Sequence, residues 1–208
     1  MDGTILSRRT IDVLCEAFGK TFELEELNSR APNMFEYEVS QEIAHILSGV
    51  KKEEMEEHFD SIPLNKGVQK FIEFLKDYGF KTGIVTDSYQ FLAERLAKKL
   101  GVDLIYGNAV ELREGVFTGK LVIRYPCMNI PNCRKYSLCK RRVLLKLKEK
   151  ICGVSVAVGD SGSDICMVQA ADIGIAYNPK SAQLMNLAKF TVFSFEELEK
   201  ILRPYFTF

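Results

Sequence analysis

The 208-residue chain is 47% hydrophobic and has 28 Lys plus Arg against 28 Asp plus Glu, so its formal net charge is zero. This length is enough for one core domain and a small insert, and no run is long and apolar enough to span a bilayer. The balanced charge gives no global field for nucleic acid or an anionic membrane, and we expect neither as a partner. The N-terminus has no charged flank leading into an apolar stretch, which predicts a cytoplasmic protein without a signal peptide.

Residues 7–64 carry the apolar periodicity of helices, with apolar positions recurring at three- and four-residue intervals. No strand pattern interrupts this region. The helices are expected at Thr10–Leu14, Val39–Leu47 and Lys51–Phe59.

After Pro63 the pattern changes to an alternation of helix and strand, which is typical of a parallel sheet. A β-hairpin is expected where two short apolar runs flank Arg113, Glu114 and Gly115. From Lys140 to Phe206 helix and strand alternate again. The expected elements are a helix at Gly67–Tyr78, a strand at Lys81–Thr86, a helix at Gln90–Leu100, a strand at Leu104–Tyr106, and hairpin strands at Val110–Leu112 and Val116–Ile123.

The segment Gly159-Asp160-Ser161-Gly162-Ser163-Asp164 follows the apolar run Val154–Val158 and places two carboxylates where a buried strand meets a helix. Open α/β sheets bind ligands at the carboxyl ends of their parallel strands. Mg²⁺ typically takes one or two protein carboxylates and completes its shell with water and phosphate oxygens. The segment therefore indicates phosphate chemistry, although Asp and Ser also cap helices in ordinary turns.

The first residues, Met1-Asp2-Gly3-Thr4-Ile5-Leu6, resemble the end of the Asp-x-Asp-Gly-Thr signature of the haloacid dehalogenase superfamily of phosphohydrolases. The family's other motifs follow in order: Thr86 after an apolar run, Lys140 at the start of a helical segment, and the acidic pair already quoted. The stretch from Val156 to Ala176 is most similar to phosphoserine phosphatases and their relatives.

The resemblance implies an α/β fold with a Rossmann-like parallel-sheet core and an inserted helical cap that closes over the site. The core would comprise residues 1–6 and 65–208, and the cap residues 7–64. It also implies Mg²⁺-dependent hydrolysis of a small phosphorylated metabolite through an aspartyl-phosphate. Such a covalent intermediate divides one difficult displacement into two easier ones.

The resemblance assigns a role to each matching residue. Asp2 would be the general acid and base, while Thr86 and Lys140 would bind the phosphoryl group. The metal would be held by Asp160, with Asp164 as a direct or water-mediated second acid and with Asp2 beside them.

The family's nucleophile is the first Asp of the signature, and Met1 occupies the position after it. The Asp is therefore expected one residue before Met1, preceded by the apolar strand that lies in the middle of the family's sheet. Without this strand both neighbouring strands would keep unpaired backbone groups in a buried layer. The alternative is a catalytically inactive relative that binds a phosphorylated ligand or a partner protein.

Arg9 stands where phosphoserine phosphatases have a Glu that helps to read the amino-acid end of the substrate. A cation cannot pair with an ammonium group, so Arg9 could favour a second anionic group such as a carboxylate or another phosphate. The alternative is that Arg9 is a solvated residue of the Arg8-Arg9 pair.

Six cysteines are expected to stay reduced. Cys127, Cys133, Cys139 and Cys152 could form a Cys₄ zinc site, but the paired Cys-x₂₋₄-Cys spacing that is usual for structural zinc is missing. The other interpretation is a loop with reduced thiols that closes the site beside Lys140.

Overall fold

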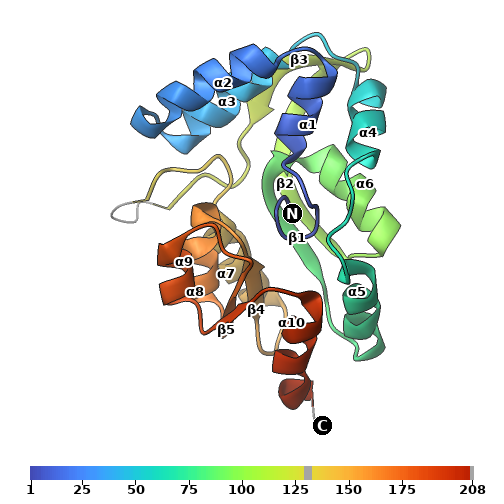
Figure 1. Ribbon diagram of the computed structural model, residues 1–208, viewed down its shortest axis with the longest axis vertical. Helices are drawn as coiled ribbons and strands as arrows, with labels where there is room; N and C mark the ends of the chain where they lie inside the picture. Colours follow the sequence, from blue (N-terminus) through green and yellow to red (C-terminus); the bar gives the residue numbers. More distant parts are fainter. Residues whose placement is uncertain (129–132, 207–208) are drawn as a thin grey trace.

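The computed structural model describes residues 1–128 and 133–206 and has an α/β architecture with two three-stranded sheets (Figure 1). In the first sheet β1 pairs with β2 in parallel and β2 with β3 in antiparallel orientation. In the second sheet β4, β5 and β6 are all parallel. The α/β class predicted from the sequence is confirmed. The strands are β1 (Gly83–Tyr89), β2 (Leu104–Arg113), β3 (Val116–Val122), β4 (Val156–Gly159), β5 (Ile173–Tyr177) and β6 (Phe190–Val192).

Helices predominate before β1 and lie in most of the connections between the strands. No helix in the described part of the chain is long and apolar enough to cross a membrane. The helices are α1 (Thr10–Ala17), α2 (Thr21–Arg30), α3 (Glu36–Ile46), α4 (Lys52–Asp60), α5 (Val68–Asp77), α6 (Gln90–Leu100), α7 (Lys140–Lys150), α8 (Ile165–Ala170), α9 (Ala182–Leu187) and α10 (Phe195–Leu202), with short 3₁₀ turns at Ala31–Asn33, Gly162–Asp164 and Arg203–Phe206.

Residues 7–64 fold into α1 to α4, and the chain enters and leaves this region at adjacent points. Ser7 N–H donates to Pro63 O (2.9 Å), and Asn65 N–H donates to Ile5 O (2.8 Å). One apolar cluster runs through this region and both sheets, since Leu14 and Met55 belong to the same cluster as Ile84 of β1 and Ile175 of β5. The division into a cap of residues 7–64 and a core of residues 1–6 and 65–208 stays a prediction.

Two details differ from the sequence-based expectations. Helix α2 was not expected, because Leu24 and Leu27 are its buried residues in an otherwise charged stretch and give too little periodicity. The expected runs at Leu104–Tyr106 and Val110–Leu112 belong to one long strand, β2, whose pairing register shifts along its length.

The hairpin of β2 and β3 reaches toward the helices that precede it in the sequence. Its turn has positive φ at Glu114 (50°) and Gly115 (78°), which suits a two-residue hairpin turn. Helix α3 packs on β3, where Gln41 Nε2 donates to Gly119 O (2.7 Å). The hairpin therefore supports the helical region from the side of the first sheet.

β1 and β4 are edge strands of their two sheets in the described part of the chain, and an apolar groove separates them. A cavity of about 300 Å³ occupies this groove. Its walls include Gly83–Val85 from β1, Val156–Val158 from β4, and side chains from α5 and α10. Met1 lies at one end of the groove and also lines a second cavity.

Candidate active site

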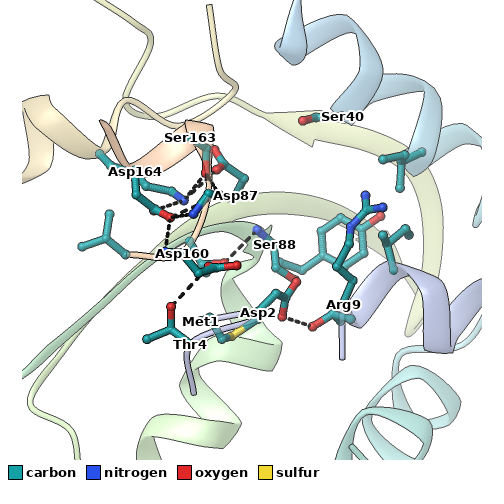
Figure 2. A pocket seen from close by; sticks show the side chains of 18 of the residues that line it. Met1, Asp2, Thr4, Arg9, Ser40, Asp87, Ser88, Asp160, Ser163 and Asp164 are labelled. Atoms are coloured by element: carbon teal, nitrogen blue, oxygen red, sulfur yellow. Dashed lines mark hydrogen bonds and ion pairs between the residues drawn. The ribbon is translucent and has the colours of Figure 1, made fainter. Parts of the chain in front are cut away.

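The second cavity, of about 310 Å³, lies where β1 and β4 end and where α1 and α3 face them. It is lined by all six residues that the sequence singled out, and Figure 2 labels Asp2, Arg9, Asp160 and Asp164 among them. They are Asp2, Arg9, Thr86, Lys140, Asp160 and Asp164.

Asp164 organises the loop that follows β4. Its Oδ2 accepts hydrogen bonds from the backbone N–H of Asp160 (3.0 Å) and of Ser161 (3.1 Å). Gly159 permits this turn, since a Cβ there would lie 2.2 Å from the Cβ of Asp164. Although burial favours the neutral acid, the ammonium of Lys140 lowers the pKa of Asp164 below its usual range.

Asp160 faces the N-terminal loop and is buried. Its Oδ1 accepts a hydrogen bond from Thr4 Oγ1 (3.3 Å), and its Oδ2 lies 3.0 Å from Lys180 Nζ. Gly3 has φ 74°, and a Cβ there would lie 2.2 Å from Asp160 Oδ2. Gly3 is thus required sterically, because only glycine lets the loop approach this carboxylate so closely.

Lys140, the first residue of α7, is buried and bracketed by acids. Its Nζ donates to Ser163 Oγ (2.7 Å) and Asp164 Oδ1 (2.8 Å) and lies 3.1 Å from Asp87 Oδ2. Burial alone would lower the pKa of the Lys140 ammonium, but the two carboxylates outweigh it and raise the pKa. Lys140 is therefore a fixed positive charge at neutral pH.

Asp2 projects from the N-terminal loop, and its Oδ1 accepts a hydrogen bond from Thr10 Oγ1 (2.7 Å). Burial raises the pKa of Asp2, against the opposing effects of the N-terminal amine and Thr10. A carboxyl group in this environment holds a proton at higher pH than an exposed Asp does.

Thr86 and Arg9, the other two predicted site residues, come from different elements. Thr86 is buried in β1, and its Oγ1 accepts a hydrogen bond from Ser88 N–H (3.1 Å). Arg9 precedes α1, and its Nη1 lies 3.3 Å from Asp12 Oδ1.

Three site residues were missed by the sequence reasoning. Ser163 lies within the acidic segment, and Asp87 directly follows Thr86. Both could have been proposed as site residues because they are adjacent to residues that the motifs identify. Lys180 follows β5, the parallel strand that pairs with β4. Its position after the carboxyl end of a strand, where such sheets bind ligands, could have indicated a site residue.

The segment before Lys140 connects the site to α3. Backbone N–H groups of Glu36 and Tyr37 donate to the carbonyls of Arg134 and Lys135, each at 3.0 Å. Arg134 also forms an ion pair with Glu36 at 2.8 Å. This connection ties the N-terminal end of α3 to the residues that lead into α7.

The cysteines do not support the zinc alternative. The Sγ atoms of Cys127 and Cys133 lie 3.5 Å apart, while Cys152 is exposed and follows α7. Across residues 1–128 and 133–206, no group of three or more His, Cys, Asp or Glu side chains is placed to hold a metal ion. None of the six cysteines is in a disulfide, and the interpretation as a loop with reduced thiols stays a prediction.

The oxygen-donor set suits Mg²⁺, which needs only one or two protein carboxylates. Asp160 lines the cavity and supplies carboxylate oxygens, and a bound Mg²⁺ would take the place of the Lys180 ammonium that lies 3.0 Å from its Oδ2. Asp164 is more fully engaged by hydrogen-bond donors, which fits a supporting role.

The sequence matches the haloacid dehalogenase-like hydrolases over residues 1–169. The chain therefore belongs to this family.

Within the family it is a phosphoserine phosphatase-like enzyme. It is 28% identical to a phosphoserine phosphatase from Idiomarina loihiensis over 96% of this chain and 88% of the relative. It is 30% identical to one from Archaeoglobus fulgidus over 86% of this chain, and the match covers 51% of that longer protein. The chain thus spans about half the length of the Archaeoglobus relative.

Solved structures agree on the fold. A phosphoserine phosphatase captured as a phospho-aspartyl intermediate analogue has a TM-score of 0.79 at 22% identity, covering 97% of this chain and 95% of its own. A HAD family hydrolase from Salmonella enterica serovar Typhi has a TM-score of 0.85 at 21% identity, covering 96% and 68%. The Rossmann-like interpretation is confirmed by these similarities.

Proposed function

We propose that the protein is a Mg²⁺-dependent phosphomonoesterase that acts on a small phosphorylated metabolite through an aspartyl-phosphate. The observation that carries this proposal is the convergence of Asp2, Thr86, Lys140, Asp160 and Asp164 on one cavity. The cytoplasmic location expected from the sequence stays a prediction.

The nucleophile in this proposal is an Asp that directly precedes Met1. Met1 lines the cavity together with Asp2, Lys140, Asp160 and Asp164. A residue joined to Met1 would therefore enter the cavity among these groups.

The groove between β1 and β4 supports a strand before that Asp. Both flanking strands have a free edge among the described residues, and the groove walls are largely apolar. Four or more β-favouring apolar residues would satisfy the backbone groups of both edges and join the two sheets into one. Met1 lies where this strand would deliver the chain to the active site.

The chain's own residues divide the chemical work. The raised pKa of Asp2 favours a protonated carboxyl that gives its proton to the leaving alkoxide and then takes one from the attacking water. Lys140 and the Thr86 hydroxyl hold the phosphoryl oxygens as charge develops on them. Arg9 would contact the substrate from the side of α1.

Asp160, with support from Asp164, would hold Mg²⁺. Bound there, the ion would neutralise charge on the phosphoryl oxygens.

The proposal is tested by reading the codons upstream of Met1 and by screening phosphomonoesters with Mg²⁺, using protein that begins at the natural upstream start. An Asp codon directly before Met1 and turnover of at least one ester are expected. Changing that Asp to Asn should eliminate the covalent phospho-enzyme while ligand still binds. An in-frame stop codon directly before Met1 would overturn the catalytic proposal and favour the binding-only alternative.

A further inference from the structure

The cavity wall formed by α1, α3 and β3 carries one charged side chain among the described residues. Arg9 provides that charge, and Figure 2 shows it across the cavity from Ser163 and Asp164. The rest of this wall is formed by Thr10, Ile11, Leu14, Ser40, Ile43 and Leu121.

The acids that line the cavity belong to its opposite side or are already engaged. Asp160 is paired with Lys180, and Asp164 is paired with Lys140. Asp87 contacts Lys140 through Oδ2, and its Oδ1 is buried without a hydrogen-bond partner, but Asp87 follows Thr86 on the Lys140 side of the cavity. Asp2 is held by Thr10. An ammonium group on a leaving group that points toward α1 would therefore meet a guanidinium instead of a carboxylate.

Arg9 remains available to a ligand. Its contact with Asp12 is a single one at 3.3 Å between side chains that are 47% and 38% exposed, and such pairs are weak. Glu36 is close enough for Arg9 to affect its pKa, but it is engaged by Arg134 at 2.8 Å. A guanidinium with free donors binds carboxylate or phosphate in a bidentate manner.

We infer that the site selects phosphomonoesters whose leaving group carries a second anionic group, bound by Arg9, and that it discriminates against a leaving group with a free ammonium. This inference rests on the proposed function, because it takes the Lys140 side of the cavity as the phosphoryl site. The apolar side chains of Ile43 and Leu121 would contact the carbon chain between the two anions.

The test measures binding by calorimetry in the presence of Mg²⁺, on the natural chain with any Asp before Met1 changed to Asn so that ligand is not consumed. O-phosphoserine and 3-phosphoglycerate are the central pair, since they differ in having an ammonium or a hydroxyl beside the same carboxylate. We expect 3-phosphoglycerate to bind at least about tenfold more tightly. Equal affinity, or a preference for O-phosphoserine, would overturn the inference.

Two further comparisons identify the second anion. Tighter binding of 3-phosphoglycerate than of glycerol 3-phosphate would assign a carboxylate. Tighter binding of 1,3-propanediol bisphosphate than of its monophosphate would assign a second phosphate. The absence of both preferences would refute a role for Arg9 in reading an anion.

Arg9→Glu should remove or reverse the preference, and Arg9→Gln should reduce it. Arg8→Glu is the matched control, because it makes the same charge change on a residue that pairs with Glu16 and is not part of the cavity wall. The control should keep the affinity ratio within about twofold. An equal effect of both Glu variants would attribute the preference to long-range charge alone and overturn the inference.

Hydrolysis of p-nitrophenyl phosphate, whose leaving group has neither an ammonium nor a second anion, tests the proposed function separately. Selective binding without any turnover by the unaltered natural chain would refute the catalytic proposal and leave the specificity inference standing.

Discussion

Replacing Lys140 with Met should destabilise the protein strongly, because it leaves two acids without their cation. The side chains of Lys140 and Asp164 are 9% and 8% exposed, so their pair is buried. Removing one partner of a buried pair costs about 3–5 kcal/mol of unfolding free energy. Asp87 loses its ion-pair partner as well, although its side chain is 26% exposed.

Urea unfolding of wild type and Lys140→Met at pH 7 measures this cost, and Lys148→Met is the matched control. Lys148 is on the same helix as Lys140, and its Nζ lies 2.7 Å from Asp172 Oδ1. These two side chains are 31% and 44% exposed, so a much smaller loss of stability is expected.

The difference between Lys140→Met and wild type should also depend on pH. In the wild type the lowered pKa of Asp164 gives stability that is present above the unfolded pKa near 3.8 and is lost as pH falls through the folded value. In the variant, burial without the ammonium shifts the pKa of Asp164 upward, so protonation of its carboxylate as the pH falls relieves part of the destabilisation. The reasoning is refuted if the two lysine variants lose equal stability, or if the Lys140→Met deficit stays constant from pH 7 to pH 4.

Three further predictions follow from the site and its surroundings. Asp160→Asn should abolish Mg²⁺-dependent turnover of the upstream-extended protein with an unchanged circular dichroism spectrum; full activity would contradict the metal assignment. Tyr89→Phe should raise the unfolding free energy by about 1 kcal/mol, because the Tyr89 hydroxyl is buried without a hydrogen-bond partner. A lower unfolding free energy would show that the hydroxyl has a hydrogen-bond partner in the folded protein. Gly3→Ala should lower the unfolding free energy more than Gly19→Ala. Both glycines have positive φ, but a Cβ at Gly3 would lie 2.2 Å from Asp160 Oδ2, whereas nothing lies within 4 Å of a Cβ at Gly19. Equal losses would mean that the loop shifts freely away from Asp160.

The sequence predicted the parts of the site that are set by local patterns. Asp160 and Asp164 follow an apolar strand, and Thr86 and Lys140 occur where the family's motifs place them. Asp87 and Lys180 could not be found in the same way, because their roles depend on which strands become neighbours. Lys180 reaches Asp160 since β5 pairs with β4, a relation that a local pattern does not contain.

The fold was predictable to a similar extent. Helix α6 matches the expected range because apolar periodicity and the terminal Gly101, at φ 69°, both mark it. The hairpin turn was also predicted, whereas the continuity of β2 was not. That continuity depends on pairing first with β1 and then with β3, which residue periodicity along one strand cannot show.

The two free edges at the groove also have a consequence for handling the protein in solution. Edge strands with unpaired backbone groups are templates for pairing with other chains, and natural sheets usually cover or charge them. Within residues 1–128 and 133–206, β1 and β4 present such edges at the groove, with apolar side chains beside them. Protein without a strand in this groove should therefore aggregate more steeply as its concentration rises. Protein extended by an N-terminal strand that fills the groove should remain monodisperse at concentrations where the shorter form precipitates.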